Sequence, residues 1–471
     1  MSTALVLFRR DLRLADNPAL TAACAAHAQL LPVYIHAPNE NGAWPAGAAT
    51  RWWLHHSLAA LDERLRARQS GLHLAQGETL DVLRQLIAQT GAGAVYWNRR
   101  YEPAAIARDT QIKSALREQG IAVHSHNSAL WCEPWQIATQ QGQPYRVFAP
   151  YWRNLRAQLP APEPLAEPSL SAWREPTDGV PLSALGLLPR VRWDAGLAQH
   201  WSPGEAGAAD LLEIFGDDAV NDYARGRDLP ARHGTSRLSP HLHFGEISPR
   251  QIHARLDRLA LQADARRRPD IEPYLRELGW REFAHHLLYH FPTTPTDNFN
   301  PRFVHFSWAA PDEVALARWQ QGRTGVPLVD AGMRELWHTG WMHNRVRMIV
   351  ASFLTKNLRQ HWHHGARWFW DTLVDADLAN NTMGWQWVAG CGADAAPYFR
   401  IFNPVMQAKR FDPEGYYLRR WLPELADAPL ALLQEPWRDA DLLRRSGYPA
   451  PMVDPGQSRQ LALDAYRALA R

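Results

Sequence analysis

The sequence contains few cysteines and no long apolar run, and these absences exclude several classes of protein. Its three cysteines, Cys24, Cys132 and Cys391, are odd in number and far apart. They predict neither a disulfide framework nor a zinc site, and they fit a reducing cytoplasm. No run of about 18 apolar residues is present, so no membrane span is expected. The N-terminus shows no signal-peptide cleavage pattern, and we therefore expect a cytoplasmic protein.

Lysine is also scarce, since Lys113, Lys356 and Lys409 are the only lysines among 51 basic residues. Arginine suits phosphate recognition, although the codon bias of a GC-rich genome explains this ratio equally well. The net charge of +3 and the pI of about 8.8 are compatible with a nucleic-acid partner but do not require one. Tryptophan is abundant instead, with 22 residues, and many of them flank polar side chains.

No Gly-x-Gly-x-x-Gly motif follows the first apolar run, so the sequence does not indicate a dinucleotide site of the usual Rossmann type. Short apolar runs nevertheless alternate with helical patterns as far as residue 126, which predicts a doubly wound, Rossmann-like parallel sheet. The apolar runs are Ala4–Phe8, Leu30–Ile35, Leu72–Leu74, Ala94–Trp97 and Ile121–Val123. The helical patterns are Pro18–Ala28, Arg51–Gln69, Thr79–Thr90 and Pro103–Glu118.

The pattern changes beyond residue 130. Residues 131–200 include six prolines between Pro160 and Pro181, which exclude long helices and central strands. We interpret them as an interdomain linker with a short helix around Tyr151–Gln158. Residues 201–471 are almost entirely helical in pattern, and the whole chain is too long for one compact core. The expected helices are Ile247–Gln262, Pro273–His290, Asp312–Gln321, Asp330–His338, Trp341–Asn357 and a tail after Asp454.

One stretch, DADLANNTMGWQW at Asp375–Trp387, gathers acids, amides and large aromatic residues without any lysine or arginine. Each buried acid or amide costs roughly 1–3 kcal/mol when it has no partner, so a plain core helix does not explain this mixture. Asp377 and Asn381 are four residues apart and would share one face of a helix. A polar helix end before a packed aromatic turn is one interpretation. The other is a pocket for a large, flat, hydrogen-bonding ligand.

Other short motifs favour the pocket. Arg347 is a natural partner for an aspartate, because an Arg–carboxylate pair is planar and strong when partly buried. Together with the first stretch, these motifs resemble those of the DNA photolyase/cryptochrome family, and within it most of all the bacterial cyclobutane pyrimidine dimer photolyases. The resemblance extends from residue 4 to about residue 455. The motifs are FRRDLRL at Phe8–Leu14 with DNPAL at Asp16–Leu20, GTSRLSP at Gly234–Pro240, ELGWREF at Glu277–Phe283 and WMHNRVRM at Trp341–Met348.

The resemblance implies an α/β antenna domain over residues 1–130, a linker over 131–200 and an all-α FAD-binding catalytic domain over 201–471. It also implies the light-dependent repair of cyclobutane pyrimidine dimers in DNA. In that reaction an electron passes from excited, reduced FAD to a dimer that has been flipped out of the duplex. The activity implied is that of a carbon–carbon lyase with damaged DNA as its partner. We expect a monomer without a metal or a membrane anchor.

The resemblance assigns the FAD site to two groups of residues. The first would hold the diphosphate and ribityl chain, although a helix cap is the plain interpretation of TSRLSP. In the second group, Arg347 would pair with Asp375 beside the isoalloxazine, Asp377 would accept hydrogen bonds from the cofactor and Asn381 would face the redox nitrogen. The first group is Tyr223, Thr235, Ser236, Arg237, Leu238 and Ser239. The second is Glu277, Trp280, Arg281, Asn344, Arg347, Asp375, Asp377 and Asn381.

The resemblance also implies a pocket for the flipped dimer. Trp280 and Trp387 would form its flat walls, although core packing is the plain interpretation of Trp280. Glu277 would bond the base edges. Family members that repair the (6-4) photoproduct carry histidines where this chain has Asn344 and Met348, so dimer repair is favoured. The residues expected to act in catalysis are Glu277, Trp280, Asn344, Met348, Asn381 and Trp387.

Two further sets of residues follow from the resemblance. One is a chain of tryptophans that carries an electron from the surface towards the flavin, expected at Trp308, Trp362 and Trp385, with Trp368 and Trp370 as other routes. The other set contacts DNA, where phosphate contacts position the duplex without reading its sequence. Each basic residue of this set is equally well explained as a solvated charge. The set is Arg227, Trp280, Asn344, Arg345, Trp387, Gln407, Lys409 and Arg410.

The antenna chromophore is the remaining expectation. We expect 5,10-methenyltetrahydrofolate, with a deazaflavin or no antenna as alternatives, and with Arg51, Trp52, Trp53 and Asn98–Tyr101 as candidate lining residues. The histidines of His361–His364 have no tight metal-binding spacing. Two other functions stay open: a cryptochrome-type photoreceptor without repair activity, and a light-independent electron-transfer flavoprotein. The complete set of pocket residues and the short C-terminal segment favour repair.

Overall fold

The computed structural model describes residues 2–159, 163–170, 173, 176, 178–262, 270–395 and 399–469. The chain forms two compact units, each assembled from separate segments of the sequence. Unit 1 comprises Met1–Tyr145, Ala149–Asn221 and Ser236–Pro292, and unit 2 comprises Arg146–Phe148, Asp222–Thr235 and Thr293–Arg471. The domain boundaries expected at residues 130 and 200 stay predictions.

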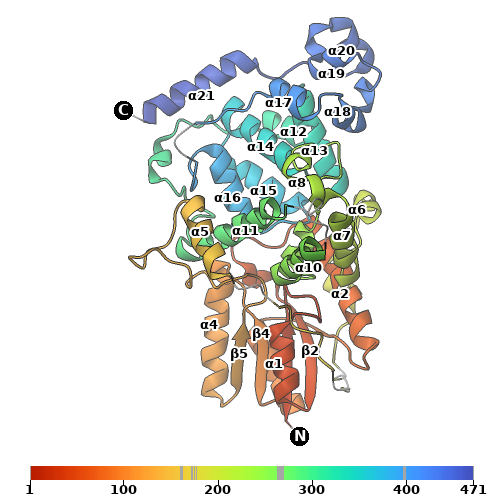
Figure 1. The fold of residues 1–471 in the computed structure, drawn as a ribbon, viewed down its shortest axis with the longest axis vertical. Coiled ribbons are helices and arrows are strands. Elements are labelled where there is room, and N and C mark those ends of the chain that lie inside the picture. Colours follow the sequence, from red (N-terminus) through yellow and green to blue (C-terminus); the bar gives the residue numbers. More distant parts are fainter. Residues whose placement is uncertain are drawn as a thin grey trace. The chain divides into compact units, whose positions relative to one another are not determined.

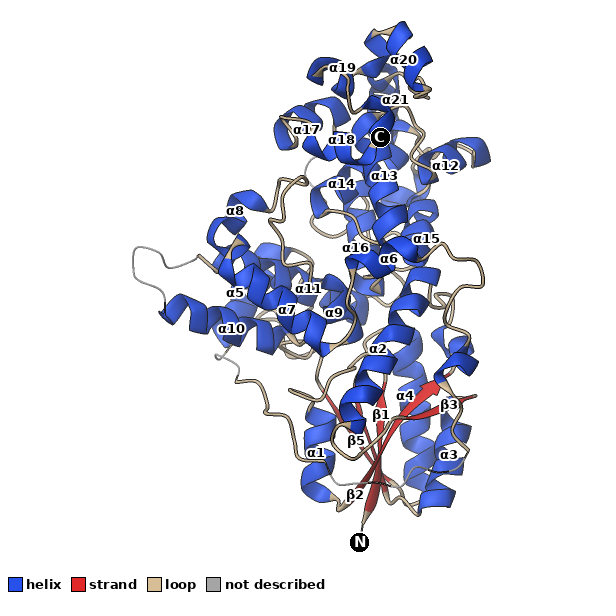
Figure 2. Ribbon diagram, turned by 90° about the vertical axis from the view of Figure 1, so that its right-hand side faces the viewer, coloured by secondary structure: helices blue, strands red, loops and turns tan. Residues whose placement is uncertain are grey.

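A five-stranded parallel sheet forms the centre of the N-terminal part of unit 1 (Figures 1 and 2). Its order is β3-β2-β1-β4-β5, and in β1 Val6 lies opposite Pro32 of β2 and Tyr96 of β4. All of β1 is buried, as is usual for a parallel sheet covered on both faces. The predicted doubly wound sheet is therefore confirmed. The strands are β1 (Thr3–Phe8), β2 (Gln29–His36), β3 (His73–Gln76), β4 (Ala94–Asn98) and β5 (Ala122–His126).

Local sequence signals explain the helices between these strands. In α1 the Asn17 side chain accepts a hydrogen bond from the backbone N–H of Leu20, and Pro18 starts the helix. The apolar stripes of α3 and α4, including Leu83 and Ile112, pack with Leu5 and Val95 of the sheet in one core. The four helices are α1 (Pro18–Ala26), α2 (Ala48–Arg66), α3 (Thr79–Thr90) and α4 (Pro103–Glu118).

The rest of unit 1 is helical and is tied to the sheet by a buried arginine. Arg13, in the loop after β1, donates hydrogen bonds to the carbonyl oxygens of Ser128 (2.9 Å) and Gly245 (2.8 Å). Gly245 has a φ of +67°, and a Cβ there would lie 2.2 Å from the Arg10 carbonyl oxygen, so only glycine fits. The elements are α5 (Phe148–Gln158), η2 (Leu182–Leu185), α6 (Ala195–His200), α7 (Glu205–Asp217), α9 (Ser239–Phe244), α10 (Pro249–Gln262) and α11 (Glu272–His290).

Unit 2 is all helix and loop in its described residues. Its longer elements are α12 (Glu313–Gln320), α13 (Pro327–Thr339), α14 (Asn344–Ser352), α15 (Trp362–Thr372), α16 (Leu378–Ala389), α17 (Pro404–Phe411) and α21 (Pro455–Leu469). The shorter ones are α8 (Tyr223–Gly226), η4 (Pro301–His305), a π-helix η5 (Phe353–Asn357), α18 (Tyr416–Trp421), η6 (Pro423–Leu425), α19 (Leu430–Gln434), η7 (Pro436–Arg438) and α20 (Ala440–Ser446). The short helix η3 (Ala219–Asp222) belongs to unit 1 except for Asp222. No described helix is both long and apolar enough to cross a membrane.

The structure corrects two local expectations. The helix expected over Trp341–Asn357 begins three residues later, because the His343 side chain caps it by accepting a hydrogen bond from the Arg345 N–H. Its last turn is the π-helix η5, a form that often occurs at functional sites. Asp377 is the N-cap of α16, so it does not share a helix face with Asn381. Its carboxylate accepts hydrogen bonds from the backbone and the side-chain N–H of Asn380.

Candidate cofactor and substrate site

The centre of the candidate site in unit 2 is an ion pair between α14 and the segment before α16. Arg347 donates from Nη2 to Oδ2 of Asp375 at 2.8 Å and from Nε to the carbonyl oxygen of Met342 at 2.7 Å. The Asp375 side chain is almost fully buried. Both contacts therefore hold the guanidinium in one orientation, and its pairing with Asp375 is the one that the resemblance implied. Such a fixed pair can set the charge around a flat ligand.

Helix α16 presents the next predicted residue. The Asn381 side chain donates from Nδ2 to the carbonyl oxygen of Ala366 on α15, at 2.9 Å. This hydrogen bond fixes the orientation of the Asn381 amide group. Trp387 lies half-buried farther along α16, and the guanidinium carbon of Arg400 lies 5.1 Å from its ring centroid.

Sequence reasoning missed two residues that shape this helix. Gln386 is buried, its Nε2 donates to the carbonyl oxygens of Thr294 and Asp297, and its Oε1 accepts from the Phe299 N–H. It therefore pins the loop after α11 to α16. Arg400 over Trp387 was also missed. No periodic signal marks either residue, since Arg400 lies outside the helices that the sequence predicts and Gln386 lies between Trp385 and Trp387.

In unit 1, helix α11 carries three predicted residues on one face. Glu277, Trp280 and Arg281 are spaced at i, i+3 and i+4, so they leave the helix side by side. Arg281 donates to the carbonyl oxygen of Ala129 at 2.6 Å. On another side of the helix a Cβ at Gly279 would lie 2.4 Å from the Trp152 ring, so the glycine lets α5 approach closely.

The same helix contains a buried carboxyl group that sequence reasoning missed. Glu282 is almost fully buried and accepts hydrogen bonds from the backbone N–H groups of Trp131 and Cys132. Burial raises the pKa of Glu282 to about 7, although Arg281 and these two N–H donors favour the charged form. Glu282 therefore fixes the segment after β5 against α11.

The predicted phosphate-binding residues lie in both units. In unit 1, Arg237 has a left-handed backbone with φ of +54°, and its guanidinium carbon lies 4.3 Å from the Trp201 ring centroid. Ser236 accepts a hydrogen bond from Tyr274 at 2.8 Å. Leu238 is buried and Ser239 begins α9. Hydroxyls and a guanidinium in a tight turn are suitable donors for a diphosphate.

The other two predicted phosphate-binding residues, Tyr223 and Thr235, belong to the segment Asp222–Thr235 of unit 2. Tyr223 starts α8 and is buried, and Thr235 ends the segment. A Cβ at Gly234 would lie 2.3 Å from the Gly226 carbonyl oxygen, so the two backbones approach at a distance that only glycine allows. Arg227 places its guanidinium carbon 5.5 Å from the Tyr223 ring centroid.

The predicted DNA-contacting residues of unit 2 partly cluster around Phe411. The guanidinium carbons of Arg345 and Arg410 lie 4.5 Å and 5.0 Å from its ring centroid. Arg345 also forms an ion pair with Asp228, beside Arg227. Lys409 on the same helix is paired with Glu435 at 2.8 Å, and Gln407 is half-buried. Asn344 is exposed and Met348 is half-buried, and their i, i+4 spacing puts them on one face of α14.

The three predicted electron-transfer tryptophans change from buried to half-exposed along the series. Trp385 and Trp362 are 3% and 0% exposed, and Trp362 donates from Nε1 to Oδ1 of Asn298 at 2.9 Å. The His361 ring lies between Trp362 and the half-buried Trp308. Its centroid is 5.7 Å from that of Trp362 and 4.9 Å from that of Trp308. The Trp385 ring fills the space beside Gly365, where a Cβ would lie 2.0 Å from it.

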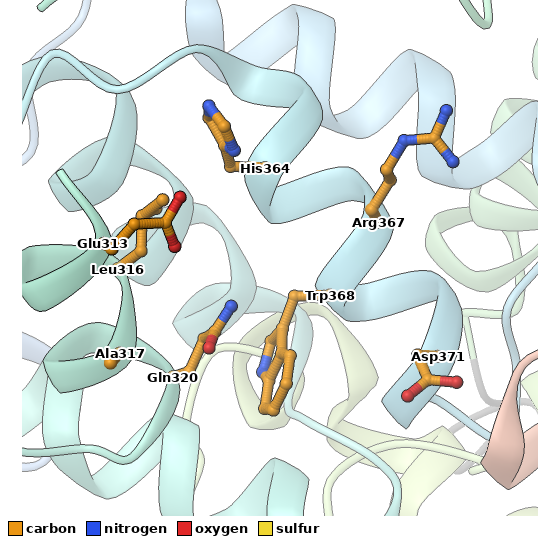
Figure 3. Close-up of a pocket in the computed structure, with 8 residues that line it drawn as sticks. All are labelled: Glu313, Leu316, Ala317, Gln320, His364, Arg367, Trp368 and Asp371. Carbon is orange, nitrogen blue, oxygen red and sulfur yellow. The ribbon is translucent and has the colours of Figure 1, made fainter. Parts of the chain in front are cut away.

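A shallow pocket of about 390 Å³ lies elsewhere in unit 2, between α12 and α15 (Figure 3). Gln320 of α12 lies beside Trp368 of α15 in this view, and Trp368 stacks on Trp337 with ring planes inclined by 8°. None of the predicted catalytic or cofactor-binding residues lines this pocket, so its size does not identify the cofactor site. Its lining residues are Glu313, Leu316, Ala317, Gln320, His364, Arg367, Trp368 and Asp371.

The candidate antenna residues are mostly buried in unit 1. Trp52 and Trp53 are 2% and 0% exposed, and Trp53 donates from its indole nitrogen to Glu246. Asn98 bonds Asp11 and Asn17, and Tyr101 donates to Glu133. The structure gives these side chains a packing role. Among the described residues, no group of three His, Cys, Asp or Glu side chains is arranged to hold a metal ion.

Comparisons with known proteins identify the family. Residues 4–169 match the model described as DNA photolyase, and residues 274–468 match the model described as the FAD binding domain of DNA photolyase. The chain is 46% identical to the deoxyribodipyrimidine photo-lyase of Agrobacterium fabrum over 99% of this chain and 98% of the relative. This chain belongs to the DNA photolyase/cryptochrome family.

Other members of the DNA photolyase/cryptochrome family extend the comparison. Cryptochrome-2 of Arabidopsis thaliana is 40% identical over 98% of this chain and 78% of its own length. A crystal structure of a bacterial class III photolyase from Agrobacterium tumefaciens superposes with a TM-score of 0.94 at 46% identity, covering 100% of this chain and 98% of that one. An archaeal photolyase from Sulfolobus tokodaii with two FAD molecules gives 0.84 at 29% identity, covering 99% and 100%. The predicted fold class and FAD-binding domain are therefore confirmed.

Proposed function

We propose that this protein is a light-dependent DNA repair enzyme that splits cyclobutane pyrimidine dimers. The observation that carries the proposal is the match along 99% of the chain to a deoxyribodipyrimidine photo-lyase at 46% identity. Asn344 and Met348 favour a cyclobutane dimer over the (6-4) photoproduct as the substrate, because neither side chain can do the acid–base work of the histidines used in (6-4) repair. Reduced FAD, when bound and excited by blue or near-ultraviolet light, supplies one electron to the dimer and recovers it after the ring opens.

The residues of the chain bind and orient the reactants. Ser236 and Arg237, with Thr235 and Tyr223, would hold the cofactor's diphosphate and sugar, since hydroxyl and guanidinium donors suit those anionic groups. The Arg347–Asp375 pair and the oriented amide of Asn381 would lie beside the ring system. Their fixed charges and dipoles need no reorganisation during the reaction, which is the usual basis of electrostatic stabilisation.

The dimer has to leave the base stack before it can react, so its pocket needs flat walls and polar contacts. Trp280 and Trp387 would supply the walls. Glu277, one helical turn from Trp280, would hydrogen-bond the base edges and stabilise the reduced dimer while its ring opens. The arginines around Phe411 would hold the flanking phosphates.

Three finer points are part of the proposal. The antenna is proposed to be 5,10-methenyltetrahydrofolate, and the archaeal photolyase with two FAD molecules makes a second flavin the alternative. Acid extraction and mass spectrometry of freshly purified protein distinguish the two. The tryptophan series Trp308, Trp362 and Trp385 is proposed to carry electrons towards the cofactor. The protein is proposed to act as a cytoplasmic monomer, which light scattering and cell fractionation test.

The test of the proposed function is repair of an oligonucleotide that contains one thymine dimer, under blue light and in the dark. Photoreduced protein is expected to restore the thymines in the light alone. The 40% identity to cryptochrome-2 makes a photoreceptor the second candidate. FAD binding without repair of either the dimer or a (6-4) substrate would favour that candidate and contradict the proposal.

A further inference from the structure

The middle residue of the predicted tryptophan series has a defined hydrogen-bond partner. The indole nitrogen of Trp362 donates to Oδ1 of Asn298 at 2.9 Å, and the Trp362 side chain is buried. Asn298 is half-buried and lies in the loop before η4, outside every predicted motif. Its amide oxygen is an acceptor that carries no net charge and is a very weak base. The partner of Trp362 is therefore a fixed dipole and not an ionisable group.

The loop that carries Asn298 is fastened to α16 on both sides of this residue. The Gln386 side chain forms three hydrogen bonds of between 2.7 and 2.9 Å to the loop backbone. Asn300 also donates its backbone N–H to the carbonyl oxygen of Cys391, just beyond α16, at 2.8 Å. Asn298 is thereby held by the helix that carries Trp385, and not by its bond to Trp362 alone. The partners of Gln386 are the carbonyl oxygens of Thr294 and Asp297 and the N–H of Phe299.

Two imidazole rings lie against Trp362 and are uncharged at neutral pH. The ring centroids of His363 and His361 lie 3.9 Å and 5.7 Å from that of Trp362. Burial lowers the pKa of His361 to about 4, and burial also lowers the pKa of His363. Neither ring therefore places a positive charge against the indole. The indole N–H is bonded to Asn298, so neither imidazole is placed to accept its proton.

An amide acceptor has two effects on an indole that loses an electron. The oxidised ring is a cation, and a hydrogen bond from a charged donor is stronger than one from a neutral donor. The bond to Asn298 therefore stabilises oxidised Trp362 more than neutral Trp362, and a buried site enlarges this difference because water screens it less. The oxidised ring is also a much stronger N–H acid, but an amide oxygen is too weak a base to take the proton.

We propose that Asn298 is a positioning residue for electron transfer, which makes Trp362 easier to oxidise and keeps the oxidised ring protonated. This inference rests on the proposed role of Trp308, Trp362 and Trp385 in electron transfer. One electron passes from Trp362 to oxidised Trp385, which leaves neutral Trp385 and a radical cation on Trp362. The N–H bond of Trp362 stays intact. One electron from Trp308 then restores neutral Trp362, and no proton moves at Trp362 in either step.

The choice of an amide at this position determines how far the missing electron travels. If a base took the indole proton, Trp362 would become a neutral radical. The electron from Trp308 would then have to arrive together with a proton, so this second step would be slow. With Asn298 as the partner, each step moves an electron alone, and the oxidised site reaches the half-buried Trp308 before the charges recombine.

The first test removes the acceptor and follows electron transfer by transient absorption of the FAD-bound protein after a blue flash. Asn298→Leu keeps a side chain of similar size without a hydrogen-bonding group. Electron transfer from Trp362 to oxidised Trp385 is expected to slow by about tenfold, which corresponds to a barrier change of about 1.4 kcal/mol. FAD content and thermal melting show whether the variant is folded. An unchanged rate in a folded, FAD-bound variant overturns the inference.

The second test exchanges the amide for a base of nearly the same shape. It uses the Trp308→Phe background, in which the oxidised site stops at Trp362, so that the spectrum reports this residue. With Asn298 present, the spectrum of a tryptophan radical cation is expected. With Asn298→Asp added, the carboxylate accepts the indole proton, and the spectrum is expected to change to that of a neutral tryptophan radical. A radical cation that persists in the double variant overturns the inference.

A matched control separates the bond to Trp362 from a general effect of charge in the loop. The Asn300 side chain caps η4 by accepting a hydrogen bond from the Arg302 N–H, a role that aspartate also fills. Asn300→Asp therefore adds a carboxylate two residues from Asn298 without replacing the acceptor of Trp362. It is expected to leave the transfer rate and the radical cation unchanged. The same neutral radical in this control overturns the specific role of Asn298.

The two possible failures differ in the protein that retains Asn298. If tryptophan radicals form there but do not respond to the Asn298 variants, the role of Asn298 is wrong and the tryptophan series stays intact. If no tryptophan radical forms while the protein still binds FAD, the proposed electron-transfer series is wrong, and the inference fails with it.

Discussion

Arg347 of α14 holds the buried carboxylate of Asp375 through a 2.8 Å hydrogen bond, which joins α14 to the segment that leads into α16. The two residues are 28 positions apart in the sequence. Their pairing brings together the helices that carry Asn344 and Met348 on one side and Asn381 and Trp387 on the other. The geometry of the proposed cofactor site in unit 2 therefore depends on this contact.

Removing the arginine is expected to damage the site more than removing a similar ion pair elsewhere. Arg347→Ala leaves Asp375 buried without its charge partner, which costs about 3–5 kcal/mol of stability. The variant is expected to lose most of its bound FAD. The matched control is Arg334→Ala, which breaks the half-exposed pair with Glu424 in the same unit. Absorbance spectra of the purified variants measure FAD content, and equal FAD loss in both would contradict a specific role for Arg347.

The basic residues around Phe411 are expected to determine the salt dependence of DNA binding. Arg410→Ala should lower the slope of log affinity against log salt by about 1, because it removes one phosphate contact. Arg345→Ala should change the slope less, because Arg345 is already paired with Asp228. Lys409→Ala should have a smaller effect, because Lys409 is already neutralised by Glu435. Fluorescence anisotropy at several salt concentrations measures the slope. Arg444→Ala, on α20, serves as the control, and a slope change as large there would argue against this surface.

Trp280 is expected to contribute to binding of the damaged bases. Stacking of a base on an aromatic ring contributes about 1–3 kcal/mol, so Trp280→Ala should weaken binding of a dimer-containing oligonucleotide about ten- to hundredfold. Binding of undamaged DNA should change little, because phosphate contacts dominate it. Trp337→Ala removes a tryptophan that is 54% exposed and stacked on Trp368, and it should leave both affinities unchanged. Unchanged dimer binding by Trp280→Ala would remove this residue from the pocket.

His343 is expected to make stability depend on pH in a defined window. Burial, followed by the charge of Arg345, lowers the pKa of His343 to about 4, below the unfolded value of about 6.5. Between these values the unfolded chain binds a proton that the folded protein does not. Stability therefore falls as the pH drops from about 6.5 to 4, by about 1.4 kcal/mol per pH unit for this one group.

His343→Asn provides the comparison, because asparagine is a good N-cap that does not titrate. The free energy of unfolding of wild type minus that of the variant should decrease over this window, measured by denaturant titration at several pH values. His286 and His361 carry the same shift, and Glu282, with its raised pKa, acts in the opposite direction, but all three are present in both proteins. A difference that stays constant with pH would show that His343 does not titrate as described.

Much of the fold was predictable because local signals agree with the tertiary structure. Pro103 starts α4, and Gly91 in the left-handed conformation ends α3, so both helices have the bounds that the sequence predicts. The strands are short apolar runs between helices, which only a covered parallel sheet accommodates. The N-cap roles of Asp377 and His343 were not predictable, because an aspartate or a histidine near the start of a helix can lie either just before its first turn or within it.

The residues of the candidate site and their roles stay predictions, and most of their arrangement in space could not be predicted from the sequence. The pairing of Arg347 with Asp375 was implied by the family resemblance, and the opposite charges of the two motifs are compatible with it. The support by Gln386 and the contact of Arg400 with Trp387 depend on packing between segments that carry no shared pattern.

The most direct test of the central claim is to count repaired dimers per protein molecule without added reductant. The protein is photoreduced once, the reductant is removed under nitrogen, and excess dimer-containing oligonucleotide is then exposed to blue light. The account predicts many dimers repaired per protein, because the electron returns after each ring opens and no net oxidation occurs. Repair that stops at one dimer per protein, or that proceeds equally in the dark, would contradict it.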